Sequence, residues 1–193
     1  GQNIEPHMLS IMPVGKKRNL LDKFRKGTYS QDGEEGILNR IFEIINPKNR
    51  YCVDVGAHDG IHFSNSRYLI HECGWTGCLI EGDEERFTKL KQAYKPRDKL
   101  SLVNKYVTSD GTNSLEHILN SVEAPLEFDL LLIDVDGMDY FIWESVIRFK
   151  PIAVVIEFNP TVPNDVIFVQ AKKSNINHGS SLLALIELAR RKG

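Results

Sequence analysis

The sequence has few cysteines and no long apolar run. Cys52, Cys73 and Cys78 are the three cysteines among 193 residues, and none of them has CxxC spacing. An odd number of scattered thiols argues against a disulfide framework and a structural zinc site, and it is typical of a reducing compartment. No segment approaches the ~20 apolar residues of a membrane span, and the N-terminus lacks the apolar core of a signal peptide. We therefore expect a cytoplasmic protein with no membrane partner.

An excess of charge of either sign is also missing. Lys and Arg number 24 against 26 Asp and Glu, which gives a formal net charge of −2. The composition therefore provides no global basic field that would indicate a nucleic-acid partner. Internal repeats are absent, and the length suffices for one continuous core. The expected organisation is an N-terminal arm with a short helix over residues 1–29, followed by one domain over 30–193.

From residue 51 onward, short apolar runs alternate with amphipathic segments. Runs rich in Val, Ile and Leu predict strands at 51–55, 77–80, 100–104, 128–133 and 152–158. Helical spacing predicts helices at 64–73, 84–94, 114–120, 140–148 and 180–192, and a further helix capped by Asp32 before the first strand. Continuous apolar strands are usually covered on both faces. The pattern predicts an α/β, Rossmann-like, mostly parallel sheet with helices on both faces.

A glycine turn follows the first predicted strand. Gly56 and Gly60 follow the apolar run, and Glu81 ends the next run 21 positions after Gly60. Glycines let the backbone approach a nucleotide-type ligand closely, and a carboxylate ~20 residues further on can hydrogen-bond ribose hydroxyls. Because His58 replaces the middle glycine of the dinucleotide fingerprint, a purely structural strand-to-helix turn remains an alternative.

Three segments in this order resemble the class I S-adenosylmethionine-dependent methyltransferases, and most closely the FkbM-type family. The segments are 53–60 (VDVGAHDG), 79–83 (LIEGD) and 129–137 (DLLLIDVDG), and the resemblance covers residues 30–192. It implies that the first segment contacts the amino-acid part of the cofactor and that the acidic residue of the second binds the ribose. It also implies a class I methyltransferase fold whose last strands would follow residue 193.

The resemblance assigns cofactor-binding residues one by one. Asp54 would meet the cofactor's ammonium group or orient the loop, and Glu81 would take the ribose, with a solvated strand end as the alternative for Glu81. Gln31 lies in a segment that covers the cofactor cleft in similar proteins, and it would donate to the cofactor carboxylate. The implied cofactor-binding set is Gln31, Asp54, Gly56, Ala57, Gly60, Glu81 and Asp134.

Two residues are predicted to serve the chemical step. Asp136 would assist deprotonation of the acceptor, because an alcohol is a poor nucleophile until a base or a Lewis acid stabilises its alkoxide. His58 would line the acceptor side of the site, with helix capping as its alternative role. The remaining histidines show no ligand spacing and are interpreted as surface or satisfied side chains.

Carboxylates gather at the ends of the fourth and fifth predicted strands. Asp134, Asp136 and Asp139 follow the fourth strand, and Glu157 and Asn159 end the fifth. Like charges this close need a cation or a shared proton. The arrangement resembles metal-dependent O-methyltransferases of this fold, in which oxygen ligands hold Mg²⁺. This resemblance predicts Asp134, Glu157 and Asn159 as metal ligands, with helix-capping or hydrogen-bonding carboxylates as the alternative.

The predicted function is O-methylation of a sugar or small-metabolite hydroxyl with S-adenosylmethionine, so the expected partner is a small-molecule or saccharide acceptor. An NAD-dependent Rossmann enzyme and a non-catalytic methyltransferase-like binding module are the alternatives. The fifth strand would form a sheet edge, which we expect to be covered by segment 166–169, by further strands or by a second copy. Assembly into a homo-oligomer is therefore one of these alternatives.

Overall fold

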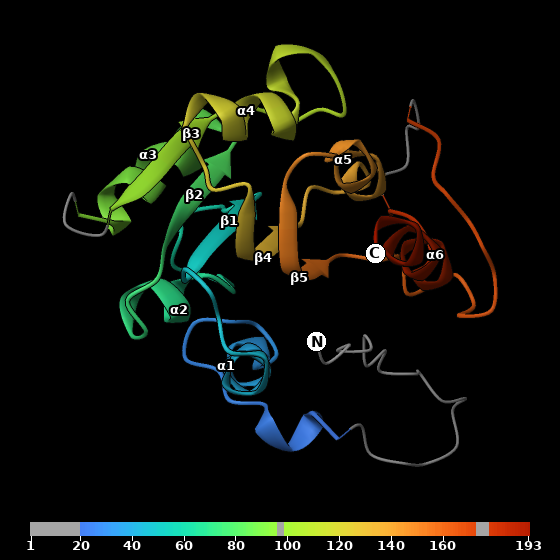
Figure 1. The fold of residues 1–193 in the computed structure, drawn as a ribbon, viewed down its shortest axis with the longest axis horizontal. Coiled ribbons are helices and arrows are strands. Elements are labelled where there is room, and N and C mark those ends of the chain that lie inside the picture. The colour runs from blue at the N-terminus through green and yellow to red at the C-terminus, as the bar shows by residue number, and fades with distance from the viewer. Residues whose placement is uncertain (1–19, 96–98, 173–177) are drawn as a thin grey trace, which may run out of the picture.

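Five parallel strands form a single sheet in a computed structural model that describes residues 20–95, 99–172 and 178–193 (Figure 1). The predicted arm up to residue 19 lies outside the described residues. The strand order is β3-β2-β1-β4-β5, and every pairing is parallel. The strands are β1 (Tyr51–Val55), β2 (Thr76–Glu81), β3 (Leu100–Asn104), β4 (Glu127–Ile133) and β5 (Lys150–Ile156). The predicted α/β, Rossmann-like sheet is confirmed.

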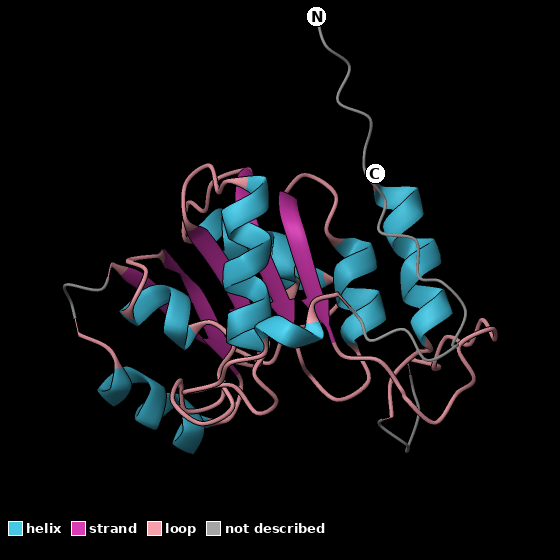
Figure 2. Ribbon diagram, turned by 90° about the horizontal axis from the view of Figure 1, so that it is seen from below, coloured by secondary structure: helices cyan, strands magenta, loops and turns pink. Residues whose placement is uncertain are grey.

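Helices cover both faces of this sheet (Figures 1 and 2). One apolar core joins the sheet to α4 (Leu115–Ser121), α5 (Asp139–Ser145) and α6 (Leu182–Lys192). The other core joins it to α1 (Glu34–Ile45), α2 (Arg67–His71) and α3 (Glu84–Ala93). Short 3₁₀ helices in the described residues include η1 (Asp22–Phe24) and η3 (Gly111–Asn113). The predicted helix near the N-terminus is thus a single 3₁₀ turn.

The alternation of side chains along the strands places two carboxylates on one face. Cys52 and Leu79 pack in the core beneath α1, α2 and α3. Asp54 and Glu81 follow them by two residues, so they point to the same face of neighbouring strands. The strand order reverses between β1 and β4, and ligands of such sheets bind at the carboxyl ends of the strands beside that reversal.

The start of α1 differs from its prediction. The N-cap is Gly33 in the left-handed conformation, with φ of 81°, so the predicted cap by Asp32 is wrong. The buried carboxylate of Glu35 accepts the backbone N–H groups of Thr28, of Tyr29 at 2.9 Å and of Ser30 at 3.2 Å. These bonds fold the preceding segment back over the first turn, and Gly33 makes the tight approach. In α6, by contrast, Ser181 is a side-chain N-cap, because its Oγ accepts the N–H of Ala184 at 3.2 Å.

The outer edge of β5 is unpaired within the residues that the structure describes, since β4 is its sole ladder partner there. Segment 166–169 does not cover that edge. It bonds instead to the start of α6, with Phe168 N–H donating to Ser181 Oγ at 2.9 Å, and its apolar side chains are exposed. Further strands or a second copy remain predictions. Within the described ranges, no helix has the length and apolar character needed to cross a membrane.

Candidate functional site at the carboxyl ends of the strands

Gly56 is required by a close approach of two strand ends. Its φ is +89°, and a Cβ at this position would lie 2.0 Å from the carbonyl oxygen of Asp134. The N–H groups of Gly56 and Ala57 both donate to the Ile80 carbonyl, at 2.9 and 3.0 Å. The turn therefore joins β1 to β2 and to β4 at once. The backbone of Asp134 and the positive φ leave room for glycine alone.

Gly60 is required for a different reason. Its φ is +71°, and an added Cβ would lie 2.5 Å from Leu90 Cδ1 and 2.7 Å from Tyr94 Cε2. Leu90 lies in α3, and Tyr94 is the C-cap residue that follows this helix. The structure therefore explains Gly60 by its packing against α3. For this glycine, the purely structural interpretation of the turn is sufficient.

Glu81 is buried and connects the glycine turn to the end of β2. It is 6% exposed, so the alternative of a solvated strand end is wrong. Its Oε2 accepts the His58 N–H at 2.9 Å, and its Oε1 accepts the Asp83 N–H at 2.8 Å. Each carboxylate oxygen has a second lone pair. Glu81 is thus fixed in position and still able to accept from a hydroxyl.

Asp54 is a buried carboxyl with little compensation for its charge. It is 7% exposed and accepts the hydroxyl of Ser66 at 2.6 Å. Burial raises the pKa of Asp54 to about 6, the Ser66 hydrogen bond opposes that rise, and the charges of Asp134 and Glu81 add to it. A neighbouring cation would favour the ionised form. The site therefore presents a carboxyl that suits a positively charged ligand.

The raised pKa of Asp54 predicts a specific pH dependence of stability. A carboxyl whose pKa rises on folding stabilises the protein below its unfolded value of 3.8, and this contribution is lost as the pH rises through about 6. The loss amounts to about 3 kcal/mol at full ionisation. We expect Asp54→Asn to gain most of this free energy of unfolding, relative to the parent protein, between pH 4 and pH 7.5, because a small part of it is already lost at pH 4. Urea titrations at both pH values measure it, and the exposed Asp110→Asn serves as the control. A difference between variant and parent that does not change with pH would contradict the assignment.

His58 and His62 flank a second buried carboxylate in the loop after β1. Asp59, 8% exposed, accepts the His62 N–H at 2.9 Å and lies 2.6 Å from His62 Nδ1. His58 Nδ1 lies 3.5 Å from the same carboxylate, and His58 has a left-handed φ of 52°. Desolvation by itself would raise the pKa of Asp59. The hydrogen bonds that the carboxylate accepts, first those from His62, outweigh this effect and lower the pKa below its usual range. His62 is exposed and bonded to Asp59, which agrees with the prediction that the remaining histidines are surface or satisfied side chains.

The carboxyls of Asp134 and Glu157 form a hydrogen-bonded pair at the ends of β4 and β5. Partial burial and then the charge of Asp134 raise the pKa of Glu157 to about 7. Asp134 and Glu157 are both exposed residues, so partial desolvation of the carboxyl, and then the charge of Asp136, raises the pKa of Asp134. Two carboxyls in contact share a proton more readily than both ionise. Asp136 is exposed, with a left-handed φ of 52°.

Asp139 organises the turn after β4 and does not face a ligand. It is 2% exposed and accepts the N–H groups of Val135 at 3.0 Å and of Gly137 at 2.9 Å. The hydrogen-bonding alternative therefore holds for this carboxylate.

The predicted metal set is not assembled. The Oδ1 of Asn159 accepts both the N–H of Thr161 at 2.9 Å and its hydroxyl at 2.6 Å, which uses both lone pairs in a local turn. Asn159 therefore does not fit the role of an oxygen ligand. In the described part of the chain, no three His, Cys, Asp or Glu side chains are grouped to hold a metal ion. Asp134 and Glu157 have each other as partners in place of a cation.

Gln31 lies in the segment before α1. Its side chain is exposed and makes no hydrogen bond with another described residue. The segment around it is instead fixed to α1 through Glu35. A role for Gln31 in binding the cofactor remains a prediction.

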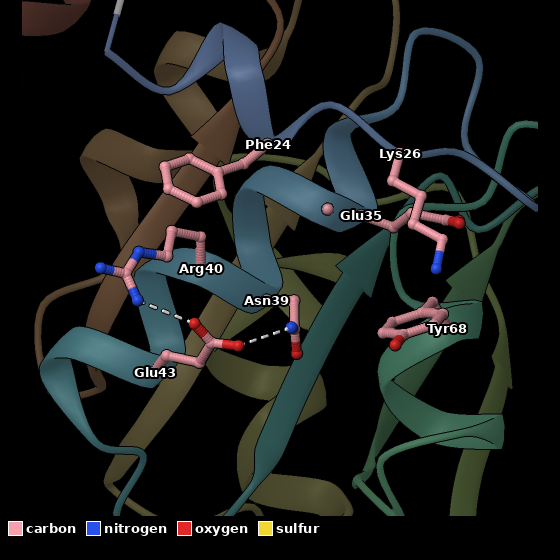
Figure 3. Close-up of a pocket in the computed structure, with 8 residues that line it drawn as sticks. Phe24, Lys26, Glu35, Asn39, Arg40, Glu43 and Tyr68 are labelled. Carbon is pink, nitrogen blue, oxygen red and sulfur yellow. Dashed lines mark hydrogen bonds and ion pairs between the residues drawn. The ribbon is translucent and has the colours of Figure 1, made fainter.

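A pocket of about 190 Å³ lies away from these strand ends (Figure 3). Glu43 accepts from Arg40 at 2.9 Å and from Asn39 at 3.1 Å on its wall. Ligand sites for drug-sized molecules are usually larger, at about 300–1,000 Å³. None of the predicted site residues contributes to this pocket. Its lining consists of Phe24, Lys26, Glu35, Gly36, Asn39, Arg40, Glu43 and Tyr68.

Comparisons with known proteins do not assign a family. No protein-family model matches the sequence, and a search of curated proteins finds no significant match. Among solved structures, the chain is similar to the PH0226 protein from Pyrococcus horikoshii OT3, with 12% identity and a TM-score of 0.40. The match covers 61% of this chain and 48% of that protein, about half of its length. At this level the similarity assigns neither a family nor an activity, and the fold rests on the strand order described above.

Proposed function

We propose that the protein binds S-adenosylmethionine at the carboxyl ends of β1, β2 and β4 and transfers its methyl group to an oxygen acceptor. The observation that supports this most is the pair of buried carboxylates, Asp54 and Glu81, on one face of adjacent strands next to the glycine turn. A cofactor with an ammonium group at its amino-acid end and a ribose diol needs two acceptors of this kind. The choice of S-adenosylmethionine as this cofactor comes from the resemblance of the three sequence segments to class I methyltransferases.

The residues of the chain would divide the work of binding. Asp54 would pair with the ammonium group and ionise as the cation arrives, because an opposite charge offsets the cost of burial. Glu81 would accept from the ribose hydroxyls with the lone pairs that the His58 and Asp83 amides leave free. Gly56 would keep the backbone close to the ligand. These residues would hold the cofactor at the edge of the sheet where β4 ends and the acidic loop begins.

Methyl transfer to oxygen requires positioning and removal of one proton. The bound cofactor supplies the methyl group on a sulfonium, and the acceptor oxygen must lie in line with it. Asp136 is exposed at the adjacent loop, and Asp134 and Glu157, whose pKa values are both raised, lie at the same strand ends. Any of these carboxyls can accept the proton of the acceptor hydroxyl. No step through a metal is proposed, since Asn159 is already engaged.

Calorimetry with S-adenosylhomocysteine, S-adenosylmethionine and NAD tests the proposal. We expect both adenosyl compounds to bind and NAD not to bind, because the full three-glycine dinucleotide fingerprint is missing and His58 occupies its middle position. Binding of NAD alone would favour the dehydrogenase alternative. Binding of the adenosyl compounds with no transfer of a labelled methyl group to sugars or small hydroxyl metabolites would favour a non-catalytic module.

The acceptor class and the cellular location are parts of the same proposal. A sugar or small-metabolite hydroxyl follows from the sequence resemblance, and a cytoplasmic location fits three cysteines that are all free thiols. Assembly into a homo-oligomer stays open. Light scattering of the purified chain would determine the oligomeric state.

Glu81→Gln should weaken the binding of S-adenosylhomocysteine by about 1.5–3 kcal/mol, roughly ten- to hundredfold in Kd. The variant keeps the size of the side chain but removes the charge that strengthens hydrogen bonds from ribose hydroxyls. Calorimetry measures Kd, and thermal unfolding reports whether the turn survives. Glu84→Gln, at an exposed position in the first turn of α3, is the control. An affinity equal to that of the parent protein would remove Glu81 from the ribose site.

A further inference from the structure

Arg67 lies between two aromatic rings and holds the end of the glycine turn. Its guanidinium carbon is 5.5 Å from the ring centroid of Tyr29 and 5.3 Å from that of Tyr94. Its Nη1 donates to the carbonyl of Gly60 at 3.0 Å. The hydroxyl of Tyr94 donates to the same carbonyl at 3.2 Å. Gly60 is thus fixed by donors from the start of α2 and the end of α3.

Tyr29 is itself held in place by two hydrogen bonds. Its backbone N–H donates to Glu35 Oε2 at 2.9 Å, and its hydroxyl donates to Glu72 Oε1 at 3.3 Å. Glu35 is 2% exposed and anchors two further amides of the same segment. A contiguous set of contacts therefore runs from α1 through Tyr29 and Arg67 to Gly60. Such a set can couple two segments that do not touch.

The guanidinium of Arg67 leaves part of its hydrogen-bonding capacity unused. Arg67 Nε is buried and has no hydrogen-bond partner among the described residues, and the same holds for Asn65 Oδ1 in the same loop. A buried donor without a partner costs free energy. Cation–π contacts with two rings offset that cost, and a planar guanidinium suits such contacts better than an ammonium. The position of Arg67 thus depends on both tyrosines.

We propose that Arg67 is a positioning residue for the cofactor site, with Tyr29 as the contact through which the N-terminal segment acts on it. Arg67 keeps Gly60 in place, and with it the loop that carries the His58 N–H to Glu81. Residues 28–32 then influence the site through this stack and need no direct contact from Gln31. The effect on affinity rests on the proposed function, whereas the effect on the loop does not.

The test compares variants that keep or remove each part of the stack. Tyr29→Leu removes a ring, Tyr29→Phe keeps it, and Arg67→Lys keeps the charge but loses the planar group. We expect Tyr29→Leu and Arg67→Lys to weaken S-adenosylhomocysteine binding about five- to tenfold, the factor that matches a lost cation–π contact, through faster dissociation. Tyr29→Phe should restore the parent affinity. Arg86→Lys, exposed on α3, is the matched control.

Hydrogen exchange without ligand provides a second readout. Amides of residues 56–66 should exchange several times faster in Tyr29→Leu and Arg67→Lys, while those of β4 keep the parent rate. Unchanged exchange in residues 56–66 would overturn the proposal, and so would parent-like affinity in both variants. If the parent protein fails to bind S-adenosylhomocysteine, the proposed function fails. The exchange rates alone then decide whether Arg67 positions the loop.

Discussion

Gly56→Ala is expected to lower the free energy of unfolding by at least about 3 kcal/mol and to abolish cofactor binding. The added Cβ would lie 2.0 Å from the Asp134 carbonyl oxygen, and backbone at the centre of a sheet cannot move aside cheaply. The left-handed φ of +89° adds a strain of about 1–2 kcal/mol for any residue with a Cβ. Relief of the clash would have to separate the end of β1 from the end of β4, and these ends carry Asp54 and Asp134.

Gly74→Ala separates the two contributions. Gly74 also has a left-handed φ, +68°, but nothing lies within 4 Å of an added Cβ. This variant should show the backbone strain alone. Urea unfolding of both variants measures the difference, and calorimetry with S-adenosylhomocysteine measures the site. If Gly56→Ala were no less stable than Gly74→Ala, the close contact between the strand ends would be refuted.

Asp129→Ala should be destabilising by about 4 kcal/mol, since several amides lose one shared acceptor. The Asp129 carboxylate is fully buried in β4 and accepts the N–H groups of Lys48 and Arg50 at 2.6 Å each. It also accepts those of Asn49 at 3.0 Å and Tyr51 at 3.4 Å. These bonds shape the connection from α1 into β1. Without the carboxylate, the amides would lose their acceptor in a half-buried turn.

Glu127→Ala is the control in the same strand. Glu127 forms an exposed ion pair with Lys48 at 2.8 Å, and exposed pairs contribute little to stability. Chemical unfolding should therefore show a large loss for Asp129→Ala and almost none for Glu127→Ala. Because Asp129 lies at the opposite end of the sheet from the glycine turn, folded Asp129→Ala should still bind S-adenosylhomocysteine. Similar losses for the two variants would show that the buried carboxylate is unimportant.

The acidic loop after β4 shows how one sequence pattern can hold several roles. Asp139 stabilises the turn through two backbone amides, whereas Asp134 pairs with Glu157 from the neighbouring strand. Asp136 has an exposed carboxyl. The three residues are alike in sequence, and only their distances to amides and to other carboxyls distinguish them. A prediction that treated them as one cluster could not separate the turn-forming residue from the paired one.

The sheet could be predicted from the chain because each strand is a short apolar run between helical segments. Burial on both faces demands continuous Val, Ile and Leu, and this demand leaves a local signal at β1 and β4. The spacing of Gly56 and Glu81 likewise placed two elements of the candidate site. The helix ends were predicted less well, and the predicted cap by Asp32 is wrong, because Gly33 is the N-cap of α1 and Glu35 binds the preceding amides.

Contacts between distant residues were decided only by the tertiary structure. The strand order brings Asp54 beside Glu81 and Asp134, and it turns an ordinary carboxyl into one with a raised pKa. Asp129 meets the turn before β1 across some 80 positions of sequence, and Arg67 finds its two rings on separate elements. Periodicity reports whether a side chain is buried, but not which group it meets there. Partner and charge state follow from packing, which depends on the whole chain at once.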